Sequence, residues 1–181
     1  MARMGKRVLR PGGRELTLQL IRALSIRPGD DIVEFAPGLG FTAARTLEQN
    51  PGSYTGVDAD EDVVRYLQRK IKGTQVSFIQ RNAAQTDLPP DSKDKVYGEA
   101  MLTMQADHRK SEIIREARRI LKKGGLYGIH ELGLTPDTIG DDHKARIQKD
   151  LAQNIRVNAR PLTEKEWGTL LEEEGFKVNK I

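Results

Sequence analysis

The fold of this chain is decided by the stretch DIVEFAPGLGFTA, residues 31–43. It runs from a short apolar strand, through the carboxylate of Glu34, into a glycine-rich turn that opens a helix. Gly38 and Gly40 carry no Cβ, so a ligand can approach the backbone of this turn closely. We expect Glu34 at the rim of the turn, where a carboxylate accepts hydrogen bonds from a cation or a hydroxyl. Two classes of cofactor are bound by turns of this kind.

Strand-like and helix-like segments alternate along almost the whole chain, which predicts an α/β fold. Such alternation is typical of a doubly wound, mostly parallel sheet with helices on both faces, in three layers. The binding site then lies at the carboxyl ends of the strands, where the winding reverses after the first strand. We expect helices over residues 16–24, 41–49, 60–72, 109–122, 144–154 and from 163, and strands over 30–36, 53–57, 75–80, 95–97, 126–129 and 176–181.

The length and composition indicate a single domain. A chain of 181 residues can bury about two thirds of its unfolded surface. The absence of cysteine excludes disulfides, a thiolate nucleophile and a cysteine-based zinc site, and we expect no metal. No apolar run of membrane-spanning length and no signal-peptide core are present, so we expect a cytoplasmic location. We divide the domain into a basic arm and helix (1–29), a cofactor-binding core (30–134) and a substrate-side segment with the last helix and strand (135–181).

The net charge of +4 is unevenly distributed. We interpret the basic helix over residues 109–122 as a solvated face with internal charge pairs. Phosphate or nucleic-acid binding is the alternative, although no aromatic residues interleave with these charges. The two basic groups are Arg3, Lys6, Arg7, Arg10 and Arg14 in the arm, and Arg115, Arg118, Arg119, Lys122 and Lys123 on the helix.

The glycine-rich turn formally fits the dinucleotide pattern, with Gly38, Gly40 and Ala43 at its small positions and Asp58 after the second strand. Glu34 argues against a nicotinamide or flavin cofactor, because a pyrophosphate would meet a carboxylate where it needs free amides and a helix dipole. A NAD-dependent reductase is therefore the weaker alternative. The same residues suit a cationic cofactor without a phosphate.

Four motifs, in order, resemble those of the class I methyltransferases that depend on S-adenosylmethionine (SAM). Residues 34–40 (EFAPGLG) are similar to the glycine-rich motif I, and residues 54–58 (YTGVD) to the strand whose terminal acid binds ribose. Residues 81–96 are similar to the adenine loop and fourth strand, and residues 120–125 (ILKKGG) to the turn before the fifth strand. The family pattern is altered at Ala36 (usually glycine), Asn82 (usually aspartate) and Lys93 (often aromatic). The resemblance implies a Rossmann-like fold and methyl transfer from SAM, which leaves S-adenosylhomocysteine (SAH).

The resemblance also implies a role for each matching residue. Asp58 would accept both ribose hydroxyls, Asn82 would face the adenine amino group, and Ala59 and Ala83 would pack on the adenine ring. The glycine-rich turn would lie under the methionine part, and Glu99 would contact the methionine end or the acceptor. Arg10 or Arg14 would close the site over the cofactor carboxylate or an anionic acceptor. The expected cofactor-binding residues are Glu34, Ala36, Pro37, Gly38, Gly40, Asp58, Ala59, Asn82, Ala83 and Glu99.

A general base is needed only if the methyl acceptor starts protonated. Candidates near the tips of the fourth and fifth strands are Glu99, His130 and Glu131, although Glu99 could bind only cofactor and His130 could face the core. We interpret His108 as a residue of a helix start. None of these residues is singled out by the sequence.

The residues directly after the fourth strand narrow the acceptor class. Residues 98–104 (GEAMLTM) lack the proline- and aromatic-containing loop that holds a flipped base in amino-nucleobase methyltransferases. This favours a small-molecule acceptor, with an RNA methyltransferase of the ribosomal adenine type or a non-catalytic SAM-binding module as alternatives. Met101, Met104 and residues 136–160 would shape the acceptor pocket, unless the methionines fill the core. Residues 176–181 would supply the sixth of the family's seven strands, so the last strand would be missing or come from a partner.

Overall fold

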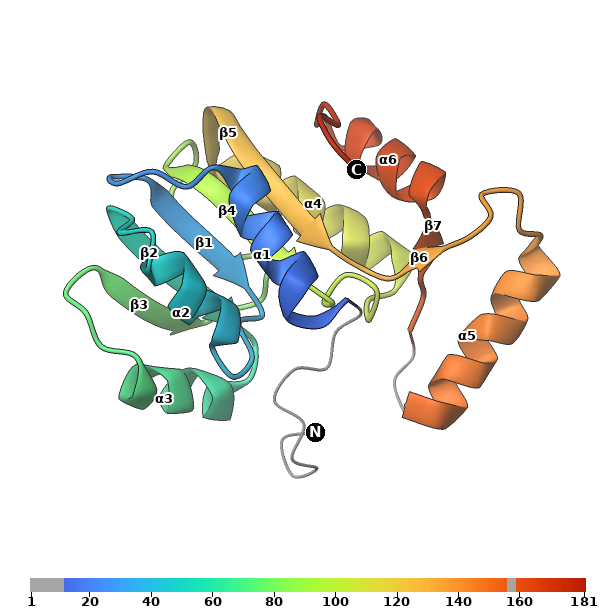
Figure 1. The fold of residues 1–181 in the computed structure, drawn as a ribbon, viewed down its shortest axis with the longest axis horizontal. Coiled ribbons are helices and arrows are strands. Elements are labelled where there is room, and N and C mark those ends of the chain that lie inside the picture. Colours follow the sequence, from blue (N-terminus) through green and yellow to red (C-terminus); the bar gives the residue numbers. More distant parts are fainter. Residues whose placement is uncertain (1–11, 156–158) are drawn as a thin grey trace.

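The computed structural model describes residues 12–155 and 159–181 and is built around a five-stranded sheet (Figure 1). The strand order is β3-β2-β1-β4-β5, and all neighbouring strands are parallel. The chain adds β2 and β3 on one side of β1 and then returns to add β4 and β5 on the other. The predicted reversal therefore lies between β1 and β4. The strands are β1 (Asp31–Phe35), β2 (Ser53–Asp58), β3 (Val76–Gln80), β4 (Lys93–Glu99) and β5 (Leu121–His130).

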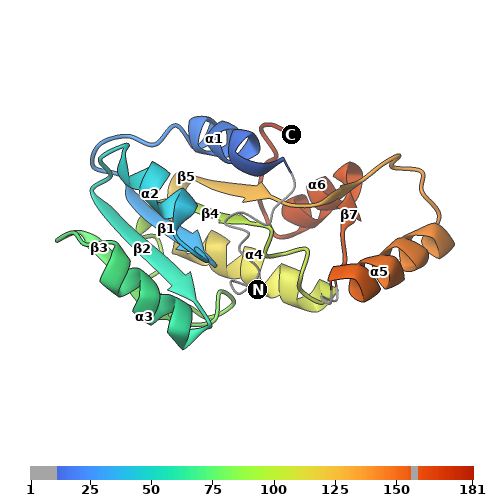
Figure 2. The same cartoon turned by 60° about the horizontal axis from the view of Figure 1, so that its bottom comes forward.

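Helices cover both faces of the sheet, which confirms the three-layer α/β fold (Figure 2). On one face, Leu24 and Leu67 of the helical layer pack in one apolar cluster with Ile32 of β1. On the other face, Ile114 and Trp167 belong to a second cluster. Because β1 is covered on both sides, it reads as a nearly continuous apolar run. The first layer contains α1 (Gly13–Leu24), α2 (Phe41–Leu47) and α3 (Glu61–Lys70), and the second contains α4 (Asp107–Ile120) and α6 (Glu164–Glu173).

Local sequence sets the starts of two helices, as predicted. The carboxylate of Asp60 accepts the backbone N–H groups of Asp62 and Val63, which otherwise lack a partner in the first turn of α3. Thr163 and Glu166 form a capping box at the start of α6, each side chain accepting the other's backbone N–H. These contacts depend only on residues within one turn of each other.

The segment after β5 lies beyond the carboxyl ends of the strands. It contains the short parallel pair β6 (Gly133–Leu134) and β7 (Leu162–Thr163), and the helix α5 (Asp141–Ile155) between them. In Figure 1, α5 stands apart from the sheet, on the side toward which the arrowhead of β5 points. The predicted helix over residues 144–154 is thus present, and the role of residues 135–181 as a substrate-side segment stays a prediction.

The predicted strand over residues 176–181 is wrong, because these residues form no strand. The ring of Phe176 packs against that of Tyr127 in β5, with 5.3 Å between the centroids. The Nε of Arg118 donates to the carbonyl of Gly175 at 3.2 Å. The alternating pattern of this segment could form a strand only beside another strand, and the ring of Phe176 is instead partly buried against the cluster on the α4 side of the sheet.

Candidate functional site

The loop between β1 and α2 has an unusual backbone that leaves room for a ligand. Gly38 and Gly40 have positive φ angles of 54° and 77°. A Cβ on Gly40 would lie 2.6 Å from the end of the Leu67 side chain, which would have to move, and the positive φ itself favours glycine. A Cβ on Gly38 would meet nothing within 4 Å in the described part of the chain. Gly38 therefore opens space at the position where the sequence predicts the cofactor.

Two alanines beside this loop adopt the left-handed backbone conformation. Ala36, which replaces the first glycine of the motif, has a φ of 53°, and Ala100, directly after β4, has a φ of 51°. This conformation costs an L-residue about 1–2 kcal/mol. The N–H of Ala36 donates to the carbonyl of Val57 at 2.8 Å, which fixes the loop to β2. The strained residues lie at the ends of the two strands that flank the reversal of winding, where functional strain is commonly found.

Asp58 ends β2, and its half-buried carboxylate faces the glycine-rich loop. Its Oδ1 accepts the N–H of Asp60 at 3.0 Å. Burial raises the pKa of Asp58, and hydrogen bonds from the backbone N–H groups of Asp60, Gly38 and Ala59 oppose that rise. The carboxylate therefore lies beside the open backbone of Gly38, and its binding of ribose hydroxyls stays a prediction. Ala59 is exposed next to it.

Glu34 is not at the rim of the loop, contrary to our expectation. Its side chain is only 3% exposed, because its place in β1 directs it to the face that α2 and α3 cover. Its Oε2 accepts the hydroxyl of Tyr54 and, at 2.8 Å, that of Tyr97, which is also 2.6 Å from Thr46 Oγ1. Burial, followed by the charge of Glu34, raises the pKa of both tyrosines well above the ordinary value and keeps them protonated. A contact between Glu34 and the cofactor stays a prediction.

Glu99 and His130 form a buried pair at the tips of β4 and β5, where they are register partners. The Oε2 of Glu99 lies 2.8 Å from Nδ1 of His130 and accepts the hydroxyl of Thr17 in α1, also at 2.8 Å. Its Oε1 accepts the hydroxyl of Thr42 in α2 at 2.6 Å. The structure thus brings two of the three candidate bases together. No sequence motif indicates the two threonines, which lie 82 and 57 residues away from Glu99.

Glu131, the third candidate, holds the loop after β4. One carboxylate oxygen accepts the N–H groups of Met101 and Leu102 at 3.0 and 2.8 Å. The other accepts the N–H and the hydroxyl of Thr103 at 2.9 and 2.7 Å. With four donors on its two oxygens, Glu131 is suited to fixing this loop and poorly placed to accept a proton from an acceptor.

The loop after β3 carries the expected adenine-binding residues and is fixed by α4. Asn82 is exposed, and its Oδ1 accepts the N–H of Ala84 at 2.9 Å, while Ala83 is half-buried. The buried carboxylate of Glu116 accepts the N–H of Thr86 at 2.8 Å and also the Thr86 hydroxyl. Burial alone would raise the pKa of Glu116, but its hydrogen bonds with Arg119 and Thr86 hold that pKa below the ordinary value. Sequence reasoning missed Glu116, because nothing in the helix pattern marks it.

The remaining predicted residues have mixed outcomes. Met101 is buried in the core cluster of α4, as the alternative interpretation proposed, and Met104 is half-buried. His108 is exposed in the first turn of α4, as predicted. Arg14 is exposed on α1, so its proposed closing role stays a prediction, and Arg10 lies outside the described residues.

The arginines on α4 are engaged in contacts within the protein. Arg115 forms two hydrogen bonds of 3.1 Å with the carboxylate of Glu174. Arg119 binds Glu116 through Nε at 2.7 Å and through Nη2 at 2.8 Å, and Arg118 holds the end of α6. These contacts support the interpretation of this face as a structural surface with charge pairs.

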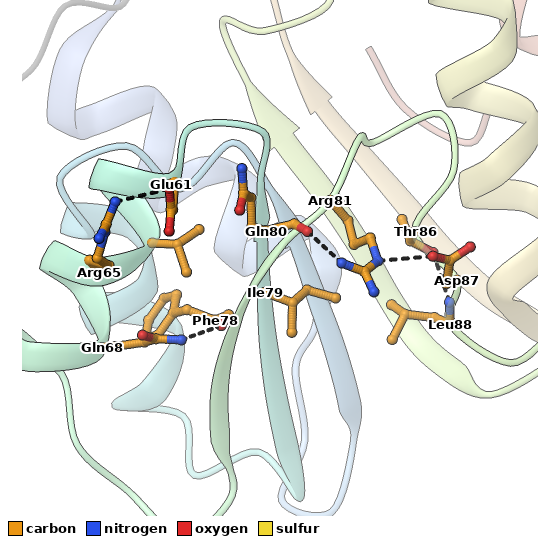
Figure 3. A pocket seen from close by; sticks show the side chains of 11 residues that line it. Glu61, Arg65, Gln68, Phe78, Ile79, Gln80, Arg81, Thr86, Asp87 and Leu88 are labelled. Atoms are coloured by element: carbon orange, nitrogen blue, oxygen red, sulfur yellow. Dashed lines mark hydrogen bonds and ion pairs between the residues drawn. The ribbon is translucent and has the colours of Figure 1, made fainter.

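A shallow cavity of about 460 Å³ lies between α3 and β3 and is also lined by residues 86–88 of the loop after β3 (Figure 3). The side-chain amide of Gln68 donates to the carbonyl of Phe78 at 2.9 Å, and Arg81 donates to that of Gln80 at 2.9 Å. Asp87 in turn accepts from Arg81 at 2.9 Å. Two side chains therefore occupy carbonyls of this edge strand, which protects it from pairing with another strand.

The predicted site combines an open backbone at Gly38 with the carboxylate of Asp58, and the loop of Asn82 and Ala83 begins beside Asp58, where the Arg81 N–H donates to the Asp58 carbonyl at 3.0 Å. Among residues 12–155 and 159–181, no group of three or more metal-ligating side chains lies close enough to hold a metal ion. Within the same residues, no helix is long and apolar enough to cross a membrane.

The parallel sheet with its glycine-rich loop at the reversal of winding, and an acid at the tip of β2, defines a class I methyltransferase fold. The chain belongs to the methyltransferase domain family, whose model matches residues 32–125. A protein of Haemophilus influenzae whose function is uncharacterised is 34% identical over 98% of this chain and 70% of its own length. Family membership argues against the reductase alternative.

Two solved methyltransferases share the fold. The SAM-dependent methyltransferase of Aquifex aeolicus has a TM-score of 0.69 at 15% identity, covering 91% of this chain and 81% of its own. Phosphoethanolamine N-methyltransferase 2 of Haemonchus contortus, in complex with phosphomonomethylethanolamine and SAH, has a TM-score of 0.74 at 20% identity. That alignment covers 92% of this chain but only 38% of the Haemonchus enzyme.

Proposed function

We propose that this chain binds SAM at the carboxyl ends of β1, β2 and β4 and transfers the methyl group to a small-molecule acceptor. The observation that carries the proposal is the carboxylate of Asp58 beside the open backbone of Gly38. Its two oxygens suit a pair of neighbouring hydroxyls, such as those of ribose. Membership of the methyltransferase family supports the same cofactor.

Bound SAM would supply an electrophilic methyl group, and the residues of the chain would bind and orient it. Residues 36–40 would lie under the methionine part, with Glu34 and Glu99 contributing negative charge near its cationic end. Asn82 and Ala83 would hold one side of the adenine and Ala59 the other. Alignment of the reacting atoms can lower the barrier by roughly 7–11 kcal/mol, so the chain needs to contribute little covalent chemistry of its own.

Two observations favour a small molecule over RNA as the acceptor. The arginines of α4 named above are bound to partners within the protein, so they do not form a free row of phosphate-binding groups. The Haemonchus enzyme, which shares the fold, is in complex with a small molecule, phosphomonomethylethanolamine, and with SAH. We propose the cytoplasm as the place of the reaction.

Calorimetry with SAM, SAH and NAD tests the cofactor. We expect wild-type protein to bind SAM and SAH but not NAD. Asp58→Ala removes two charge-assisted hydrogen bonds and should weaken SAM binding by about 100-fold. Asp62→Ala is the matched control, because the Asp62 side chain is 93% exposed on α3 and should leave binding unchanged.

Binding of NAD alone, or an equal loss of SAM binding in both variants, would contradict the cofactor assignment. The acceptor is tested separately, with tritium-labelled SAM and a cell extract divided into small-molecule and RNA fractions. We expect the label in small molecules. Its recovery in RNA would overturn the acceptor class and leave the cofactor assignment standing.

A further inference from the structure

The pair of Glu99 and His130 leaves one imidazole nitrogen without a partner among the described residues. Both residues are nine-tenths buried, and Nδ1 of His130 is 2.8 Å from Glu99. The other ring nitrogen, Nε2, has less than 1 Å² of exposed surface and finds no hydrogen-bond partner within residues 12–155 and 159–181. Because Nδ1 is held by the carboxylate, Nε2 points away from Glu99. Buried polar atoms are normally paired, so the missing partner of this nitrogen calls for an explanation.

The pair is fixed to the cofactor-binding elements. Thr42, which binds Glu99, lies two residues after Gly40 in the first turn of α2. The carbonyl of His130 accepts the N–H of the strained Ala100 at 2.7 Å. Movement of the ring is therefore restricted from both sides of the site.

Within residues 12–155 and 159–181, the titratable groups that hydrogen bonds connect to His130 lie on the sheet. Strand β4 contributes Glu99 and, farther along, Tyr97, and β1 contributes Glu34, which accepts from Tyr97. The helices α1 and α2 contribute the hydroxyls of Thr17 and Thr42. The imidazole thus faces a carboxylate on one nitrogen.

We propose that Nε2 of His130 is the general base of the reaction, that Glu99 is its positioning residue, and that the acceptor presents a hydroxyl group. This inference rests on the proposed methyltransferase function. An amine attacks before it loses a proton and a thiol ionises readily, whereas a hydroxyl gains most from a base within reach.

The proton and electron balance of this step is simple. As the acceptor oxygen forms its bond to the methyl carbon, its proton passes to Nε2 of His130. The electron pair of the broken carbon–sulfur bond stays on sulfur, which leaves SAH. The imidazolium then releases the proton to water. No oxidant or further reactant is needed.

The decisive variant is His130→Asn, whose side-chain amide can still donate to Glu99 but has no basic nitrogen. We expect its affinity for SAM and SAH, measured by calorimetry, to equal that of the wild type. The first readout uses protein loaded with SAH and the probe 4-nitrophenol, at a pH where the free probe is protonated. We expect wild-type protein to produce the absorbance of the bound phenolate, and the variant to produce none.

Turnover supplies the second readout, with 4-nitrophenol and 4-nitrothiophenol as matched probes. We expect His130→Asn to lower methyl transfer to the phenol by about 10²–10⁴-fold and to leave transfer to the self-ionising thiol unchanged. Glu99→Gln should move the acid limb of the phenol's pH–rate profile to lower pH, because a neutral amide no longer stabilises the imidazolium. A purely structural role for Glu99 would leave the position of that limb unchanged.

Three results would overturn the assignment: an unchanged probe spectrum with SAH-loaded wild type, equal loss of transfer to both probes in His130→Asn, or methylation of amines but no hydroxyl. Each of them leaves SAM binding intact. A wild-type protein that fails to bind SAM would instead overturn the proposed function itself, so the two failures are distinguishable.

Discussion

The substitution Glu131→Gln tests how the loop after β4 is held. In the wild-type protein, the two carboxylate oxygens accept three backbone N–H groups and one hydroxyl from residues 101–103. Glutamine has the same shape but only one acceptor oxygen. We expect the substitution to lower the free energy of unfolding by about 2–3 kcal/mol.

This magnitude follows from the geometry of the four bonds. The glutamine oxygen can keep the two bonds from Met101 and Leu102, without the assistance of a negative charge. The amide nitrogen then faces the N–H of Thr103, donor against donor, while the Thr103 hydroxyl can rotate and accept. The buried N–H of Thr103 loses its acceptor, which lowers the free energy of unfolding by about 1–3 kcal/mol. The weakening of the two retained hydrogen bonds lowers it further.

Thermal and urea unfolding followed by circular dichroism measure the loss. For a chain of this size, about 2–3 kcal/mol corresponds to a fall in Tm of about 4–12 °C. Glu112→Gln is the control, because the Glu112 side chain is 41% exposed in its pair with Arg109 and should contribute less than about 1 kcal/mol. If Glu131→Gln cost no more than this control, the reasoning about the loop would be refuted.

Three further predictions concern other parts of the fold. Tyr127→Phe should raise the free energy of unfolding by about 1 kcal/mol, because the buried Tyr127 hydroxyl has no partner among the described residues. Tyr54→Phe removes a hydrogen-bonded hydroxyl and should lower the free energy of unfolding. If urea unfolding ranked the two variants the other way, this prediction would be contradicted. The pKa of Glu116 is lowered on folding, so its stabilisation is present above the ordinary carboxyl range and is lost as pH falls through the folded pKa. The stability difference between wild type and Glu116→Gln should therefore shrink from pH 7 to about pH 3, and a constant difference in urea unfolding would exclude this coupling. The double substitution of Gln68 and Arg81 by alanine should uncover the edge of β3 and increase self-association in sedimentation velocity, and an unchanged monomer fraction would show that the edge needs no such protection.

Most of the fold was predictable from sequence, because its signals are local. The alternation of strands and helices indicated the parallel sheet, and the caps at Asp60 and Thr163 start helices as predicted. The strand predicted over residues 176–181 failed for a non-local reason. A strand needs a neighbour, and in the described part of the chain the apolar ring of Phe176 packs on Tyr127 where no strand pairs with the segment.

The sequence by itself determined the class of protein, and it predicts where the site lies. Glycines in a turn after a strand, and an acid at the end of the next strand, are arranged by neighbours in the chain and by the topology of parallel strands. Only the tertiary structure decided what each carboxylate does. Glu34 is bound by tyrosines 20 and 63 residues away, Glu131 by a loop 28 to 30 residues away, and Glu99 by His130 and two threonines. The sequence places all three acids at or near strand ends, but in the structure each has different hydrogen-bond partners. Burial and hydrogen-bond partners are properties of the packed chain and cannot be read from the sequence.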